Sequence, residues 1–339
     1  MSAVNLAHVK GLAAAWGIRP SRAILLRDGV YRVETPRGPY CLKRVRQPLG
    51  AVKFVRDALE HLDKRGFHRI SRFVPTRRGL PGLATAGGTW VVVEWIGGRS
   101  PNVKDREDLR QSALTLAQFH RAARGLRPRP GSIPQDFLGT WPVIFRQVQR
   151  DVHRATSRAF LHEHPLLARP LSANAGWLCR QADKALRLLS GSEYHRLVAE
   201  RRAEKGFCHG DSGGGNFVID RGGRAVLIDF ETLRSELRVY DLFRLIRRSI
   251  KRTGWRADSA RWILESYSHE NPVTAAELPL LLAWLYLPAK FARLINRYTI
   301  LKKGPERDKT LRKLNRYLAR REEMDRFLND FGRYLGVKA

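Results

Sequence analysis

An acid, an amide and a second acid stand at fixed intervals in one stretch, and this pattern constrains the fold most. Residues 207–211 read Phe-Cys-His-Gly-Asp, four residues separate Asp211 from Asn216, and Leu-Ile-Asp-Phe follows at 227–230. Between them, short apolar runs at 216–220 and 225–228 surround Arg-Gly-Gly-Arg, which predicts a β-hairpin. Such a hairpin returns Asp229 to the neighbourhood of Asp211 and Asn216.

The interval from Asp211 to Asn216 matches the catalytic loop of protein kinases, in which four residues separate the catalytic Asp from a metal-binding Asn. Phosphoryl transfer needs a base for the attacking hydroxyl and oxygen ligands for Mg²⁺. We therefore predict that Asp211 is the base and that Asn216 and Asp229 ligate the metal. His209 has no Ser or Cys to activate, so we expect it to pack beneath the loop.

Lys43 lies in an apolar segment, Tyr40–Val45, that is expected to be a strand. A strand lysine in a kinase pairs with the α- and β-phosphates of the nucleotide, although a lone strand lysine is usually just solvent-facing. The three-glycine phosphate loop of protein kinases is missing, since only Gly29 stands at 27–31. Glu60 lies off the apolar stripe of the following helix, so we do not expect it to pair with Lys43, and the acidic partner of this lysine stays unassigned.

Hydrophobic periodicity predicts a strand-rich first third followed by helices. We expect strands at 23–26, 30–35, 40–45 and 90–96, with one helix at 51–65, and later helices at 105–124, 177–189, 240–252, 259–267, 275–298 and 308–331. This order predicts a nucleotide-binding lobe at 1–97 and a helical catalytic and substrate lobe at 98–339. Backbone groups of Glu94 and Ile96 would contact an adenine edge, although a buried strand and an ordinary turn explain this stretch equally well.

Composition narrows the class of protein. A chain of 339 residues with 43% hydrophobic residues can bury a large core. The start of the chain lacks the pattern of a signal peptide, and the apolar run at 278–287 is too short to cross a bilayer. We therefore expect a cytoplasmic protein in which this run is a buried helix. Three widely spaced cysteines predict neither a disulfide framework nor a zinc site.

The formal net charge of +31 invites a polyanionic partner such as nucleic acid, anionic lipid or a phosphorylated substrate. The basic residues are spread along the chain, however, and ordinary solvated helix faces explain many of them. No dedicated nucleic-acid-binding module is present in the sequence.

These residues together resemble the aminoglycoside phosphotransferase and choline kinase-like superfamily and, within it, the CotS-like family of spore-coat-associated kinase-like proteins. The resemblance runs from about residue 24 to residue 298. It rests on the following segments: 208–211 with Asn216, 228–230, 40–43, 66–67, 94–99, 116–120 and 238–242.

The resemblance implies an α+β bilobal protein-kinase-like fold, ATP and Mg²⁺ as cofactors, and a spore-forming bacterium as the source. It assigns catalysis to Asp211, metal binding to Asn216 and Asp229, and to Asp241 a structural role beneath the catalytic loop, for which a helix N-cap is the alternative. Glu231 stands where protein kinases carry the Gly of Asp-Phe-Gly, which favours the small-molecule branch.

Three functions are consistent with the sequence. The first is an ATP-dependent phosphotransferase associated with the spore coat, whose acceptor is a hydroxylated small molecule, a glycan or a coat protein. The second is a non-catalytic kinase-like coat or scaffold protein. The third is a kinase of a cell-envelope sugar or lipid headgroup, with the positive charge serving near anionic surfaces.

Overall fold

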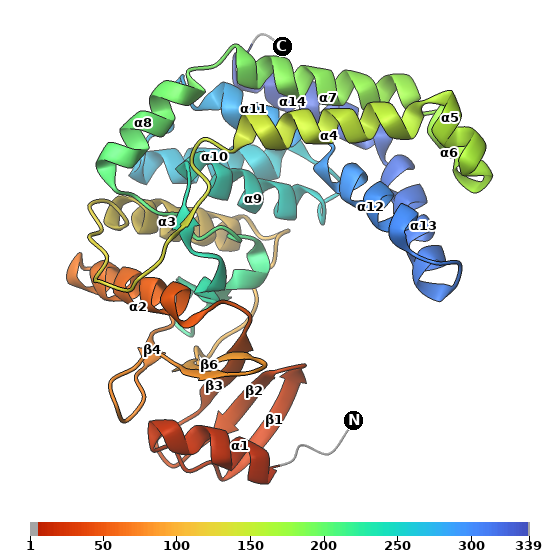
Figure 1. Cartoon of the computed structure of the whole chain (residues 1–339). Helices are drawn as coiled ribbons and strands as arrows, with labels where there is room; N and C mark the ends of the chain where they lie inside the picture. The colour runs from red at the N-terminus through yellow and green to blue at the C-terminus, as the bar shows by residue number, and fades with distance from the viewer. Residues whose placement is uncertain (1–5, 338–339) are drawn as a thin grey trace.

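The small lobe is an antiparallel sheet. A computed structural model describes residues 6–337 and shows this sheet at one end of the molecule, with strand order β1-β2-β3-β6-β4 and β5 paired to β6 (Figure 1). The strands are β1 (Arg22–Arg27), β2 (Val30–Glu34), β3 (Tyr40–Val45), β4 (Phe73–Val74), β5 (Leu83–Thr85) and β6 (Gly88–Glu94).

The two faces of the sheet have different partners, because side chains alternate along each strand. Leu42 of β3 packs on one face with Trp90 and Val92 of β6 and with Val9 of helix α1 (Leu6–Ala13). Lys43, the next residue, is only 5% exposed and lies on the other face, against helix α2 (Leu49–Lys64). The alternation of β3 thus buries a lysine between the sheet and a helix.

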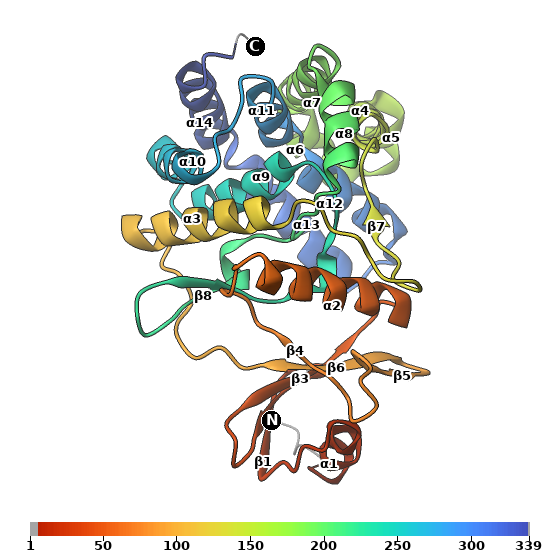
Figure 2. The same cartoon turned by 90° about the vertical axis from the view of Figure 1, so that its left-hand side faces the viewer.

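Helix α2 connects the two lobes. The four residues of its predicted apolar stripe, Val52, Val55, Leu59 and Leu62, are all buried. Three of them, Val55, Leu59 and Leu62, belong to the same hydrophobic cluster as the helical lobe, and Figure 2 shows α2 between that lobe and the sheet. Position 97 as a domain boundary therefore stays a prediction, since α2 precedes it and packs into the larger core.

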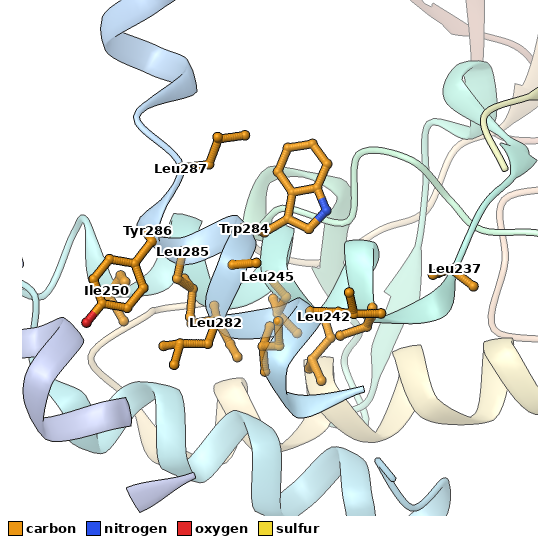
Figure 3. Close-up of a cluster of buried hydrophobic side chains, with 14 of the residues drawn as sticks. Leu237, Leu242, Leu245, Ile250, Leu282, Trp284, Leu285, Tyr286 and Leu287 are labelled. Carbon is orange, nitrogen blue, oxygen red and sulfur yellow. The ribbon is translucent and has the colours of Figure 1, made fainter. Parts of the chain in front are cut away.

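The helical lobe is built around α9 and α11, whose apolar faces interdigitate (Figure 3). Leu242 and Leu245 of α9 are at most 1% exposed, as are Leu282 and Leu285 of α11, and full burial of such a side chain contributes about 2 kcal/mol. The principal helices are α3 (Arg106–Ala122), α4 (Trp141–Thr156), α5 (Arg158–Glu163), α6 (Pro165–Ser172), α7 (Ala175–Ser190), α8 (Tyr194–Glu204), α9 (Arg238–Ile250), α10 (Ala257–Glu270), α11 (Leu278–Tyr286), α12 (Ala289–Ile300), α13 (Pro305–Leu318) and α14 (Arg321–Tyr334).

The predicted α+β, bilobal fold class is confirmed, and two of the predicted helices are corrected. The helix expected at 275–298 is divided after Tyr286, because Pro288 cannot donate to the helical ladder and excludes its predecessor from helical geometry. The helix expected at 308–331 is divided at 319–320. There α13 packs on α12 while α14 turns back against α10 and α11, which one straight helix could not do.

The apolar segment at 278–300 is the one stretch of residues 6–337 that could cross a membrane by length and composition. In the fold, 72% of the most apolar 18-residue stretch of this segment is buried inside the protein. The predicted buried helix at 278–287 is therefore observed as α11.

Gly98 provides a test of how the lobe connection is packed. Its φ of +148° is unfavourable for side chains, and a Cβ there would lie 2.2 Å from the carbonyl oxygen of Ile219. We expect Gly98→Ala to lower the free energy of unfolding by about 3 kcal/mol. The control Gly223→Ala has a φ of +76° but open space around the Cβ, and should cost only about 1 kcal/mol. Urea denaturation measures both, and equal losses would contradict the proposed clash.

Candidate active site

The hairpin predicted after Asn216 is present and places Asp229. Strand β8 (Phe217–Ile219) pairs with β9 (Ala225–Leu227), so that Phe217 lies opposite Leu227. The N–H of Ile228 donates a hydrogen bond of 3.0 Å to the carbonyl of Asn216. The residue after Ile228 is Asp229, which is consequently held beside Asn216.

Asp229 adopts an uncommon backbone conformation and makes a contact between lobes. Its φ of 67° and ψ of 62° lie in the left-handed region, which costs a non-glycine residue about 1 kcal/mol or more. The carboxylate accepts from Lys43 Nζ at 2.6 Å, and the guanidinium of Arg27 lies 3.4 Å away. The hairpin of the helical lobe is thus joined to the sheet of the small lobe by a charged hydrogen bond.

Lys43 has two carboxylate partners, because Glu231 Oε1 lies 2.9 Å from its Nζ. Burial lowers the pKa of Lys43, but the charges of Asp229 and Glu231 outweigh burial and raise it overall. Burial raises the pKa of Asp229, yet the adjacent Lys43 ammonium leaves it below its usual value. In Glu231 burial prevails, and its pKa is raised. All three groups therefore depend on one another for charge compensation.

Glu231 is a second acidic partner of Lys43, besides Asp229, and comes from the hairpin exit rather than from the helix after β3. Glu60 points elsewhere, to the guanidinium groups of Arg129 and Arg56, as its position off the apolar stripe predicts. The signal for Glu231 was its place two residues beyond Asp229 at the exit of the predicted hairpin. Without the structure, nothing indicated that this exit faces β3.

Five of the predicted site residues line one cavity of about 380 Å³ between the lobes. Lys43, Glu94 and Ile96 contribute from the small lobe and its connection, and Asn216 and Asp229 contribute from the helical lobe. The backbone N–H of Glu94 donates to Arg72 O, and its carbonyl accepts from Ser71 Oγ. Ile96 lies beyond the end of β6, where the sheet no longer occupies its backbone groups.

Asp211 lies at the edge of this arrangement. It is not among the lining residues of the cavity, and its Oδ1 contacts the guanidinium of Arg244 and lies 3.7 Å from Arg248 Nη2. Its backbone carbonyl accepts from the Asn216 side-chain N–H at 2.6 Å. This bond turns the amide nitrogen of Asn216 toward the loop and leaves the amide oxygen outside the contact. The sequence interpretation missed Arg244 and Arg248, although their spacing of four residues on one helix places them on one face.

Asp241 braces the loop that carries Asp211 from below. Its carboxylate accepts from the backbone N–H groups of His209 at 2.6 Å and Gly210 at 2.8 Å, and its Oδ2 lies 3.0 Å from His120 Nε2. Burial raises the pKa of Asp241, but hydrogen bonding and charge from His120 outweigh it, and the pKa falls to about 2. The bracing role is observed. The N-cap alternative is wrong, because α9 begins three residues earlier at Arg238.

His209 and Cys208, on the same loop, are also buried and hydrogen-bonded. His209 is fully buried and its Nε2 lies 3.0 Å from the carbonyl of Ile228, which is the packing role predicted for it. Cys208, His120 and Asp241 lie close enough together to share a metal ion. However, the Cys208 thiol donates to Glu236 O, and burial raises its pKa well above the usual value. All three cysteines, Cys41, Cys179 and Cys208, are free.

Removing the charge of Asp241 should destabilise the protein. We expect Asp241→Asn to lower the free energy of unfolding at pH 7 by about 3 kcal/mol, because two backbone N–H groups and His120 lose a buried carboxylate. The control Asp330→Asn removes an exposed pair with Arg333 and should cost about 0.5 kcal/mol or less.

The same variant has a pH signature. A carboxyl whose pKa is lowered on folding contributes stability above its unfolded pKa, near ~4, and loses it as the pH falls toward the folded value. The folded pKa of Asp241 is about 2. The difference between wild type and Asp241→Asn should therefore shrink between about pH 4 and pH 2. A difference that stays constant over this range would contradict the assignment.

Comparison with known proteins places this geometry in a family. The phosphotransferase enzyme family (APH) matches residues 26–278. Spore coat protein S of Bacillus subtilis (strain 168) is 23% identical over 306 residues, covering 88% of this chain and 86% of that protein.

Solved structures share the fold. An aminoglycoside phosphotransferase from Alicyclobacillus acidocaldarius superimposes with a TM-score of 0.79 at 23% identity, over 96% of each chain. An amicoumacin kinase solved with AMP-PNP and Ca²⁺ gives a TM-score of 0.64 at 17% identity, over 96% of this chain and 94% of that one. With a family match that spans most of its length, the chain belongs to the APH phosphotransferase enzyme family.

Proposed function

We propose that the protein is an ATP- and Mg²⁺-dependent phosphotransferase that acts on a hydroxyl group. The observation that carries this proposal is the cavity between the lobes, where buried Lys43 meets Asp229 beside Asn216. A cation on the sheet and oxygen donors on the hairpin are the groups that a Mg²⁺-bound triphosphate requires. The nucleotide analogue and divalent cation bound by the amicoumacin kinase support the same use of the fold.

The residues present fit the proposed cofactors. The amide oxygen of Asn216 and the carboxylate of Asp229 are hard oxygen donors, as Mg²⁺ prefers, and Mg²⁺ takes its remaining ligands from water and phosphates. The metal would neutralise negative charge that develops on the transferred phosphoryl group. Lys43 would hold the phosphates from the sheet. The Glu94 carbonyl, which keeps a second lone pair beside the bond from Ser71, and the backbone of Ile96 would meet the adenine edge.

Asp211 would orient the acceptor. Both arginine contacts involve its Oδ1, so Oδ2 is the oxygen available to accept the proton of an incoming hydroxyl. The amide of Asn216 and the N–H of Gly213 both donate to the Asp211 carbonyl, at 2.6 and 2.8 Å. The carboxylate of Asp241 accepts hydrogen bonds from the backbone N–H groups of His209 and Gly210, the two residues before Asp211. This network would hold the proposed base in position before the acceptor arrives, and such positioning contributes to rate.

Two substitutions separate the proposed base from the proposed metal ligand. Asp211→Asn should reduce phosphoryl transfer by at least about a hundredfold while Mg·ATP still binds, because general base catalysis contributes about 10²–10⁴. Asp229→Asn should also abolish the Mg²⁺ dependence of nucleotide binding. Coupled ADP release and calorimetry measure the two effects, with Asp330→Asn as the control. Undiminished turnover in Asp211→Asn would remove the base assignment.

We further propose that the protein associates with the spore coat, supported by its likeness to spore coat protein S. This association is compatible with a non-catalytic scaffold, and nucleotide binding distinguishes the two functions. A phosphotransferase should gain thermal stability in millimolar Mg·ATP, because a ligand that binds only the folded state raises its apparent stability. At a hundredfold excess over Kd the gain is about 2.7 kcal/mol. No Mg-dependent rise in Tm would favour the scaffold.

A further inference from the structure

We propose that the acceptor of this phosphotransferase is itself an anion: a hydroxylated molecule with a phosphate or carboxylate group, bound by a basic track that leads away from Asp211. The basic track consists of Arg244, Arg247, Arg248 and Lys251 at α9, Lys290 and Arg293 of α12, and Arg316 of α13. The inference rests on the proposed function, because it names the substrate class of the same site.

The track begins at the proposed catalytic base. Arg244 contacts Asp211 Oδ1, and Arg248, one helical turn further along α9, lies 3.7 Å from the same oxygen. Arg248 also packs over the loop, where a Cβ on Gly213 would lie 2.8 Å from its Cγ. Arg248 is 55% exposed in its side chain, while the Nε of Arg244 is buried without a hydrogen-bond partner among residues 6–337. An incoming hydroxyl therefore passes two guanidinium groups.

The track continues across three helices that meet at Tyr317. Arg247 lies over the ring of Trp255 at 4.3 Å, and it lies close enough to the buried Tyr317 hydroxyl for the pKa of each group to depend on the other. Lys290 Nζ lies 5.6 Å from the centre of the Tyr317 ring. Figure 1 shows α12 and α13 projecting from the helical lobe beside α9. Packing on these rings gathers the cationic groups on one side of the loop.

Carboxylates do not neutralise this surface. Asp211 is the one acidic side chain of residues 6–337 within 4.0 Å of a basic group of the track. Elsewhere many surface arginines have a partner, as Arg196 has in Glu193 and Glu200.

The pKa values of the two lysines of the track show that its positive charges repel one another. Burial and then the charge of Lys251 lower the pKa of Lys290 to about 8, with Arg247, Arg293 and Arg316 adding to the effect. Burial and neighbouring arginines also lower the pKa of Lys251. Mutual repulsion of this kind is relieved when an anion binds among the cations.

This arrangement selects the charge of the acceptor. Guanidinium groups bind phosphate and carboxylate through paired hydrogen bonds, and a cationic acceptor would be repelled by the same field. An anionic group held on the track would leave a neighbouring hydroxyl of the same molecule at Asp211 Oδ2. The track thus anchors one end of the acceptor while the base orients the other.

Four sugars of one scaffold test the proposal: glucose, glucosamine, glucose 6-phosphate and glucuronate. Calorimetry in saturating Mg·ADP confines anion binding to sites outside the nucleotide cavity. We expect glucose 6-phosphate and glucuronate to bind on the order of tenfold tighter than glucose, and glucosamine to bind more weakly than glucose. Comparing the affinities of glucose 6-phosphate and glucuronate shows whether the track prefers a phosphate or a carboxylate group.

The variant Lys251→Gln/Lys290→Gln should remove most of this preference, leave Mg·ADP binding unchanged and not lower the Tm of the free protein, because repulsion is relieved. The control Lys302→Gln/Lys303→Gln makes the same charge change on exposed residues beyond the far end of α12 and should bind all four sugars as wild type does.

Three outcomes would overturn the proposal. Binding of the four sugars that is equal or absent while Mg·ADP binds would remove the anionic acceptor and leave the phosphotransferase intact. If both double variants lost the preference for anionic sugars equally, the preference would come from the net charge of the protein and not from the basic track. Binding to vesicles containing phosphatidylglycerol without response to the soluble anions would assign the track to a membrane surface. Failure of Mg·ADP to bind would instead count against the proposed function itself.

Discussion

A buried ammonium group that needs compensation organises the interface between the lobes. An uncompensated charge in the protein interior costs several kcal/mol, so the position of Lys43 on the covered face of β3 demands carboxylates nearby. Asp229 and Glu231 supply them from the exit of the hairpin, at 2.6 and 2.9 Å. The left-handed backbone at Asp229 is the local conformational cost of this contact. The buried ammonium group therefore holds the hairpin against the sheet, and the cavity lies where these two elements meet.

The sequence predicts those parts of the site that depend on short-range geometry. The interval between Asp211 and Asn216 fixes a loop, and two apolar runs around a glycine turn fix a hairpin, so the neighbourhood of Asn216 and Asp229 follows without tertiary information. Strand β3 begins and ends at the predicted residues, because alternation and turn residues are local signals too.

The remainder depends on how separate elements pack. That Glu231 rather than Glu60 faces Lys43 is decided by the docking of the hairpin under the sheet, which has no local signature. The division of α13 from α14 follows from packing against different helices, whereas Pro288 did mark the end of α11. Helix α4 carried a readable pattern, since Trp141, Phe145, Val148 and Val152 recur at helical spacing and are buried, but no prediction was made for it.

The shared core of α2 has a mechanical consequence. Because α2 packs into the helical lobe, it belongs with that lobe in any relative motion, although its sequence lies among the strands. If the lobes close over a nucleotide, the sheet and α1 would therefore move together relative to α2 and the helical lobe. The two connections that join the sheet to the rest of the chain, from Val45 to Leu49 and after Glu94, lie outside the strands and helices and would have to bend in such a movement.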